Sequence, residues 1–175
     1  MKTIDIRPLD RSDDRSGFSC DDPALDRFFQ HYAGANQFKL KLGVTYVAVT
    51  DGRIIGFATV AAGSIDRHLL PSARHRRRMP TYPLPILRLA RLGVDRVVQG
   101  GGIGRRLLRH VFKLAMSQRD TLGCVGVVTD AKPGATAFYE KLGFTPMEGV
   151  REGPLHGLPT PMFLDIQAIE VALDG

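Results

Sequence analysis

The most distinctive chemical feature of the sequence is a glycine-rich run, Gln99-Gly100-Gly101-Gly102-Ile103-Gly104, which follows an apolar segment and precedes an amphipathic one. Glycines let backbone N–H groups crowd around an anion, and a helix that starts directly after such a turn adds partial positive charge at its N-terminus. The run therefore predicts a site for a pyrophosphate group. A turn that only connects a strand to a helix is the alternative.

Two common nucleotide-binding motifs do not match this run. A P-loop ends in Gly-Lys followed by Ser or Thr, whereas Gly104 is followed by Arg105 and Arg106. A dinucleotide-binding fingerprint needs G-x-G-x-x-G after the first strand and an acidic residue about 20 positions later. The glycines here have a different spacing and lie past the middle of the chain.

The residue types that commonly bind metals show no ligand spacing. Cys20 and Cys124 lie far apart and form no Cys-x-x-Cys motif. We therefore expect no metal site. The histidines are expected to be surface or structural residues: His31, His68, His75, His110 and His156.

Length and composition predict a single globular domain over 1–175. Hydrophobic residues make up 43% of the chain, enough to bury a core. The longest weakly polar stretch, 54–63, spans about ten residues, whereas a membrane-spanning helix needs about 20, and the first residues lack the apolar core of a signal peptide. We expect a soluble, cytoplasmic protein without membrane contact.

Elements that would position the glycine-rich run can be predicted along the chain. Asp22 and Pro23 have the residue types that begin a helix, its apolar face repeats at helical spacing, and Gly34 and Asn36 are expected to end it. Further helices are expected at 105–119 and 133–142. Strands are expected at 3–9, 44–50, 53–64, 86–98 and 123–129, from 144 onward, and at 162–166.

Two connections complete this prediction. Asp51-Gly52 is the strongest short signal for a hairpin between two β-rich runs. The segment 67–85 holds several prolines and arginines and is expected to be an irregular basic loop. The order of elements predicts a mixed α/β fold with one layer of sheet and helices on its faces.

Several segments together resemble the GNAT superfamily of acetyl-CoA-dependent N-acetyltransferases. Its cofactor motif is Gln or Arg, two residues, Gly, one residue, then Gly or Ala, and residues 99–104 satisfy it. Leu92-Gly93-Val94 precedes the motif, and the helix-to-strand passage AFYEKLGF (137–144) follows it. The resemblance covers nearly the whole chain. It implies the GNAT fold, a central mixed, mostly antiparallel sheet that is splayed at the acetyl-CoA cleft and flanked by helices.

A narrower resemblance links the chain to the GNAT-type toxins of bacterial type II toxin–antitoxin systems. It rests on four segments: FSCDDPALDRFF, FATVAAGSI, RRRMPTYPLPILRLARLGVD and VTDAKPGATAFYEKLGF. The resemblance implies acetylation of the amino group of aminoacyl-tRNA, which stops translation, a ribbon-helix-helix antitoxin as partner, and a homodimer. Asp21 stands where many of these toxins have Gly, and 148–161 looks longer than usual. Both departures bear on acceptor choice or antitoxin docking.

The resemblance also implies roles for residues of the acetyl-CoA site. Backbone groups of the strand pair with the pantetheine arm, the Val94 N–H polarises the thioester oxygen, and backbone N–H groups of the turn hold the pyrophosphate, with charge added by Arg105 or Arg106. The implied cofactor-binding residues are Leu92, Gly93, Val94, Gln99, Gly100, Gly101, Gly102, Ile103, Gly104 and Arg105.

Tyr139 of AFYEKLGF is the general acid that the resemblance implies. A phenol with a pKa near ~10 is protonated at neutral pH and can donate its proton to the departing thiolate. The alternative is a tyrosine that is simply packed in a helix. No carboxylate stands out as a general base, but an α-amino group titrates near ~7.7–8.0 and is partly neutral already.

Basic residues in several segments predict how the protein would bind tRNA, the molecule that carries the acceptor amine. If they gather beside the cleft, they form a phosphate-binding face for the acceptor stem of tRNA. A solvated charged loop, or a seat for an acidic antitoxin tail, is the alternative. The expected nucleic-acid contacts are Arg74, Arg76, Arg77, Arg78, Arg91, Lys39 and Lys41.

Two other functions remain open at this stage. An ordinary GNAT enzyme would acetylate a small-molecule amine or a protein amine without tRNA. A non-catalytic module with the GNAT fold would bind acetyl-CoA weakly or tolerate the loss of the Tyr139 hydroxyl.

Overall fold

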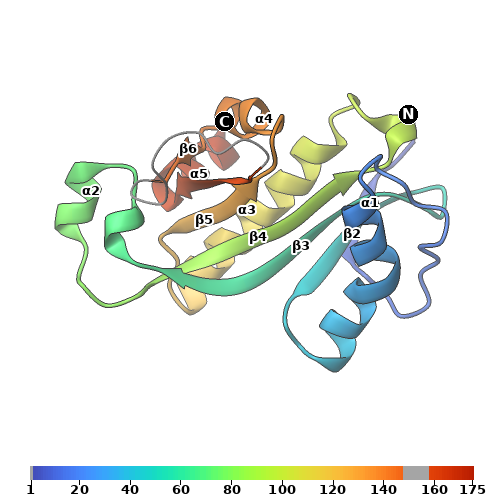
Figure 1. Cartoon of the computed structure of the whole chain (residues 1–175), viewed down its shortest axis with the longest axis horizontal. Helices are drawn as coiled ribbons and strands as arrows, with labels where there is room; N and C mark the ends of the chain where they lie inside the picture. Colours follow the sequence, from blue (N-terminus) through green and yellow to red (C-terminus); the bar gives the residue numbers. More distant parts are fainter. Residues whose placement is uncertain (1, 148–157) are drawn as a thin grey trace. The chain divides into compact units, whose positions relative to one another are not determined.

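The computed structural model describes residues 2–147 and 158–175. Their strands follow the order β1-β2-β3-β4-β5-β7-β6 in a mixed sheet. The chain divides into unit 1, Met1–Ala61 with Leu89–Val111, and unit 2, Ala62–Arg88 with Phe112–Gly175. The long strands β3 (Arg53–Ile65) and β4 (Leu84–Val94) and the helix α3 (Ile103–Thr121) contribute to both units (Figure 1).

The β-strands of unit 1 confirm the predicted hairpin. β1 (Asp5–Pro8) pairs antiparallel with β2 (Val44–Thr50), which pairs antiparallel with β3. Asp51 and Gly52, with φ values of 49° and 72°, join β2 to β3. Positive φ at both central residues is the geometry whose twist matches that of the flanking strands.

The first helix is longer than predicted. α1 (Pro23–Arg27) begins at the Asp22 cap as expected, but π-helical turns η1 (Phe28–Tyr32) and η2 (Ala35–Lys39) continue it. Gly34 and Asn36 are both helical, so the prediction that they end the helix is wrong. The Arg15 guanidinium lies 3.0 Å from the position a Cβ would take at Gly34 and donates to the Phe29 carbonyl at 2.8 Å. The glycine provides space for that arginine.

Aromatic packing holds this helical segment against the sheet of unit 1. The ring of Phe29 lies 4.4 Å from that of Phe57 on β3, and Phe18 packs edge-on against both, at 4.9 and 5.5 Å. All three side chains are buried. Burial of such rings contributes on the order of 2–3 kcal/mol each, which outweighs the weak helix propensity of Gly34.

Unit 2 corrects the prediction for segment 67–85. That segment contains a 3₁₀ turn, η3 (Arg67–Leu69), and a short helix, α2 (Ala73–Arg78). The Ser72 hydroxyl caps α2 by accepting from the His75 N–H at 3.2 Å, which satisfies a helix N–H that would otherwise lack an acceptor. The prediction of an irregular loop is therefore wrong for these residues.

The strand that leads to the glycine-rich turn ends earlier than predicted, at Val94. Asp95, which is 2% exposed, accepts from the Val97 N–H at 3.0 Å and begins a 3₁₀ turn, η4 (Arg96–Val98). The buried cap turns the chain before the glycines.

The rest of unit 2 follows the predicted order with one addition. β5 (Gly126–Ala131), α4 (Thr136–Lys141), β6 (Thr145–Pro146) and β7 (Thr160–Asp165) match predicted elements, whereas α5 (Ile166–Asp174) was not predicted. β5 and β7 pair antiparallel, with Gly126 opposite Asp165. The segment 148–161 lies mostly outside the described residues. In the described part of the chain, no helix is long and apolar enough to cross a membrane.

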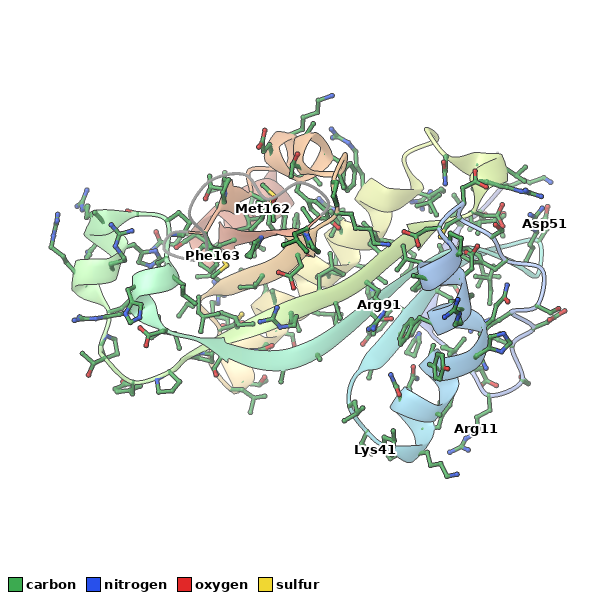
Figure 2. The ribbon with its side chains drawn as sticks, in the orientation of Figure 1. Arg11, Lys41, Asp51, Arg91, Met162 and Phe163 are labelled. Atoms are coloured by element: carbon green, nitrogen blue, oxygen red, sulfur yellow. The ribbon has the colours of Figure 1, made fainter. Side chains whose placement is uncertain are left out.

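The β7 strand shows how the core of unit 2 is filled. Met162 and Phe163 are consecutive and therefore point to opposite faces of the sheet, yet both are buried (Figure 2). Phe163 packs in a cluster with residues of β3, β4 and β5, among them Ile65, Ile86 and Val128. β7 is thus covered on both faces.

Candidate active site

The glycine-rich turn has the backbone geometry of an anion site. Gly100 and Gly102 have φ values of 84° and 85°, a region that side-chain-bearing residues rarely adopt. Outside each glycine and its two chain neighbours, no described heavy atom lies within 4 Å of the position that a Cβ would take at either glycine. α3 begins at Ile103, and the N–H groups of a first helical turn lack intrahelical acceptors. The turn therefore offers an open backbone surface at a helix N-terminus, which fits a pyrophosphate.

The Gln99 side chain connects the start of this turn to two earlier parts of the chain by hydrogen bonds. Its Nε2 donates to the Val94 carbonyl at 3.0 Å and to the Cys20 carbonyl at 3.2 Å. The side chain thus spans the residues between the end of β4 and the glycines. Sequence reasoning placed Gln99 among the cofactor-binding residues without assigning these partners.

The strand residues that precede the turn are clamped within unit 1. A Cβ at Gly93 would come within 2.7 Å of the Phe57 ring and 3.4 Å of the Cys20 sulfur. Only glycine allows this approach between strand and aromatic cluster. Leu92 and Val94, on either side, are half-buried.

Tyr139 is buried on α4 of unit 2, with 6% of its surface exposed. Its ring lies edge-on to those of Phe138 and Phe144, at 5.2 and 5.3 Å between centroids. Burial raises the pKa of Tyr139 above its usual value, while a hydrogen bond with Thr129 opposes that shift. The phenol is therefore protonated at neutral pH, as a proton donor must be.

Thr129 was not found by sequence reasoning. It lies on β5, is 3% exposed, and makes the hydrogen bond with Tyr139. The two residues belong to different elements, and no periodicity or motif in the sequence pairs them. Val94 and Tyr139, the two residues expected at the reacting centre, lie in units 1 and 2 respectively.

The arginines of α2 divide into two kinds. Arg74, Arg77 and Arg78 are exposed. Arg76 is half-buried, and its Nη1 donates to the Leu70 carbonyl at 2.6 Å and the Pro71 carbonyl at 3.2 Å. Arg76 therefore fastens α2 to the segment before it.

Two hollows flank α2 in unit 2. One, of about 730 Å³, has Arg74 and Arg78 on its rim and Met79 and residues of β7 and α5 in its walls. The other, of about 560 Å³, is lined by Arg67, Arg77 and neighbouring residues. These cationic rims can hold phosphate groups or carboxylates.

A contact between two residues that line the larger hollow, His75 and Asp165, joins α2 to the end of β7. His75 Nδ1 lies 3.1 Å from an oxygen of Asp165, which also caps α5 by accepting from the Gln167 N–H at 2.7 Å. Asp165 therefore fixes two helices at once.

The other residues that are expected to contact nucleic acid are Arg91, Lys39 and Lys41. They lie in unit 1, whereas α2 belongs to unit 2. Arg91 lies beside the helical segment of unit 1, with its guanidinium 3.8 Å from the centroid of the Phe28 ring (Figure 2). Burial lowers the pKa of Arg91. Lys39 and Lys41 are exposed near the end of η2. The structure gathers Arg74, Arg76, Arg77 and Arg78 on α2, whereas it places these three in the other unit.

The cysteines and the acidic residues of the described chain do not form a metal-binding group. Both cysteines are free and buried, and burial with a hydrogen bond to Asp26 raises the pKa of Cys20 to about 12. Within residues 2–147 and 158–175, no group of His, Cys, Asp or Glu could hold a metal ion.

Comparison with known proteins gives a consistent result. A family model described as an acetyltransferase (GNAT) domain matches residues 41–146. A protein of Mycobacterium tuberculosis named tRNA-acetylating toxin is 35% identical over 139 residues, which cover 79% of this chain and 82% of that protein.

Solved structures of the same kind share the fold. The structure described as AtaT complexed with acetyl-methionyl-tRNAfMet has a TM-score of 0.85 and 26% sequence identity, covering 97% of this chain and 98% of AtaT. The structure described as AtaTR bound with AcCoA has a TM-score of 0.77 and 27% identity, covering 96% of each chain.

Proposed function

This chain belongs to the GNAT family of acetyltransferases, and from that membership we propose that it is a toxin that acetylates the α-amino group of aminoacyl-tRNA and so blocks translation. The observation that carries the proposal is the 35% identity to a tRNA-acetylating toxin over most of both chains. AtaT, with its acetyl-methionyl-tRNAfMet complex, supports the same substrate class. An enzyme that acetylates a small-molecule or protein amine is the alternative.

The acetyl donor is acetyl-CoA, which supplies the activated thioester when it binds. We propose that the turn from Gly100 to Gly104 holds the pyrophosphate through backbone N–H groups, with charge from Arg105. The open left-handed turn at the start of α3 fits this role. Backbone groups of Leu92, Gly93 and Val94 would pair with the pantetheine arm as an added strand does.

Val94 and Tyr139 are proposed to act at the reacting centre. The Val94 N–H polarises the thioester carbonyl by donating to its oxygen, where negative charge develops. Tyr139 donates the proton of its hydroxyl to the sulfur of the departing thiolate. Burial keeps the pKa of this phenol above its usual value, so the proton is present at neutral pH.

The α-amine of an aminoacyl ester can act as the nucleophile without a strong general base. An α-amino group has a pKa near ~7.7–8.0, against ~10.4 for lysine, and an electron-withdrawing ester lowers it further. A useful fraction is therefore neutral and nucleophilic at pH 7. This chemistry favours an α-amine over a lysine acceptor.

We propose that the exposed arginines of α2 bind the phosphate backbone of the tRNA. Arg74, Arg77 and Arg78 are exposed and lie on the rims of two hollows. Arg91, Lys39 and Lys41 would add contacts from unit 1, and the fastened Arg76 would contribute through its remaining donors.

The assembly is proposed by analogy with the same relatives. A paired antitoxin of ribbon-helix-helix type, a homodimeric toxin and a cytoplasmic location are consistent with this function. AtaTR, solved with acetyl-CoA, supports the pairing. We further propose that residues 1–175 form a single GNAT domain.

Acetyl transfer from radiolabelled acetyl-CoA to a pool of charged tRNA tests the proposal, with deacylated tRNA as the control. Label that requires the amino acid and is recovered as N-acetyl-aminoacyl-tRNA is the expected result. Absence of label in tRNA, in a protein that still binds acetyl-CoA, would transfer the assignment to a small-molecule or protein amine.

The Tyr139→Phe variant tests the catalytic assignment in the same assay. Loss of a general acid lowers kcat about 10²–10⁴-fold, and the affinity for acetyl-CoA should stay unchanged because the phenylalanine ring keeps the packing. An unchanged kcat would exclude Tyr139 from proton transfer.

A further inference from the structure

We propose that Asp26 is a positioning residue for acetyl-CoA, and that it acts through residues 19–20 to hold the base of the glycine-rich turn in place. This inference rests on the proposed role of that turn in binding the pyrophosphate. All the residues concerned belong to unit 1.

The Asp26 carboxylate gathers three donors from residues 19 and 20. It accepts from the Ser19 hydroxyl at 3.1 Å, from the Cys20 backbone N–H at 2.9 Å and from the Cys20 thiol at 3.2 Å. The pKa of the Cys20 thiol is raised to about 12, so the thiol keeps its proton and remains a donor. Asp26 lies on α1, so these bonds fasten residues 19–20 to the helix.

The backbone carbonyls of Ser19 and Cys20 accept hydrogen bonds from the segment between β4 and the glycine-rich turn. The Arg96 N–H donates to the Ser19 carbonyl at 2.8 Å, and Gln99 Nε2 donates to the Cys20 carbonyl at 3.2 Å. Gln99 Nε2 also donates to the Val94 carbonyl at 3.0 Å. Residues 19–20 thus form a bridge, with donors directed to α1 and acceptors directed to the segment between β4 and the glycines.

The glycine-rich turn needs such support from outside. Outside each glycine and its two chain neighbours, no described heavy atom lies within 4 Å of the Cβ positions at Gly100 and Gly102, and glycine has more backbone freedom to lose than any other residue. The Gly101 N–H donates to the Val98 carbonyl at 3.3 Å, and Val98 itself lies between the two bridge contacts. Fixing the base of the turn therefore reduces the entropy that is lost when an anion orders its N–H groups.

A calorimetric titration of the full-length protein with CoA tests the inference without any tRNA. We expect Asp26→Ala to raise the Kd for CoA roughly 5- to 20-fold. The KM for acetyl-CoA should rise by the same factor, while kcat at saturating acetyl-CoA and the KM for the acceptor stay within about twofold. Asp26→Asn keeps an oxygen that can accept from the Cys20 N–H and should recover most of the affinity.

Asp22→Ala is the matched control. Asp22 caps the same helix by accepting from the Ala24 and Leu25 N–H groups at 3.1 and 3.2 Å, and removal of such a cap destabilises a helix by about 1 kcal/mol. This variant lowers stability while it leaves the Asp26 carboxylate in place, so its Kd for CoA should match that of the wild type.

A double-mutant cycle with Gln99→Ala shows whether the two side chains act through one bridge. If they do, the double variant binds CoA about as weakly as the weaker single variant; independent effects would multiply. Multiplying effects, or an unchanged Kd for Asp26→Ala, would overturn the inference. If Asp26→Ala does not fold, Gln99→Ala alone tests the bridge from its other end: loss of the bonds to the Val94 and Cys20 carbonyls should raise the Kd for CoA, and an unchanged Kd would overturn the inference. A wild-type protein without affinity for CoA would instead overturn the proposed cofactor role.

Discussion

Replacing Thr129 with valine should show what the Thr129–Tyr139 hydrogen bond contributes to catalysis, separately from what side-chain packing contributes. Valine has nearly the shape of threonine, so the change removes the hydrogen bond to Tyr139 and leaves the cavity filled. Both residues are buried, at 3% and 6% exposure. Leaving a buried hydroxyl without this partner costs about 1–3 kcal/mol of stability.

The effect on catalysis follows from the charge that forms on the phenol. When Tyr139 gives its proton to the thiolate sulfur it becomes a phenolate, which accepts a hydrogen bond from the Thr129 hydroxyl. A hydrogen bond to a charged group is worth about 1.5–3 kcal/mol, against about 0.5–1.5 kcal/mol for a neutral one. Because only the difference of about 1–1.5 kcal/mol acts on the barrier, kcat should decrease about 5- to 13-fold. The same bond opposes the rise in the pKa of Tyr139. Without it the pKa rises further, so the alkaline limb of the kcat–pH profile moves to higher pH.

Single-turnover acetylation at pH 7, together with urea unfolding, measures the effects on catalysis and on stability. Because the pKa of Tyr139 is already raised above its usual value, its further rise is measured separately, by ultraviolet absorbance titration of the tyrosines at alkaline pH. Thr129→Ser keeps the hydroxyl and should retain most of the activity. Thr45→Val is the stability control, because Thr45 makes the same kind of buried bond, 2.7 Å to Thr59, and contacts no proposed catalytic residue; it should lower stability and leave kcat unchanged. If Thr129→Val retains the wild-type kcat while Tyr139→Phe is inactive, the reasoning is refuted.

Three further predictions concern RNA binding, alkaline stability and backbone strain. The double variant Arg74→Ala, Arg78→Ala should weaken tRNA binding and lower the slope of log affinity against log salt concentration by about 1 for each lost phosphate contact. Filter binding from about 50 to 200 mM salt measures this slope. An unaltered slope would mean that these arginines are solvated and do not contact tRNA. Burial raises the pKa of the Cys20 thiol to about 12, so its contribution to stability is complete below the pKa of the unfolded thiol, about 8.5, and is lost as the pH rises toward 12. Chemical unfolding at pH 8 and 10 should show this loss, and a Cys20→Ala variant with an equally steep decline would contradict it. Asp21→Gly should raise stability by up to about 1 kcal/mol, because Asp21 has a φ of 62°; Lys41→Gly, at a φ of 58°, should act in the same direction, and thermal unfolding with a lower Tm for both variants would contradict the argument.

The positive φ of Asp21 also bears on the departure from the family pattern that the sequence shows at this position. The resemblance implies glycine at this position, and the left-handed backbone found here is the conformation that glycine adopts without strain. Asp is one of the few other residues that tolerate it. The departure therefore concerns local backbone strain beside the Asp22 cap of α1.

Local patterns determined those features whose cause is local. The Asp51-Gly52 hairpin, the Asp22 cap and the glycine-rich turn before α3 follow from the conformations that a few adjacent residues prefer. The same holds for α4, which carries Tyr139, since Pro133 precedes it and Gly143, with a φ of 98°, follows its last turn.

Contacts between distant segments decided the rest. Gly34 stays helical because Arg15, from a segment outside the helix, occupies the space beside it. Thr129, the partner of Tyr139, comes from β5, and Arg96 and Gln99, which donate to the Ser19 and Cys20 carbonyls, follow β4. Such pairings depend on which elements tertiary packing brings together, and the desolvation that raises the pKa of Tyr139 and of Cys20 arises only in that packed interior. The sequence by itself determined the family and the residue types of the site, and the tertiary structure decided which side chains hold them in place.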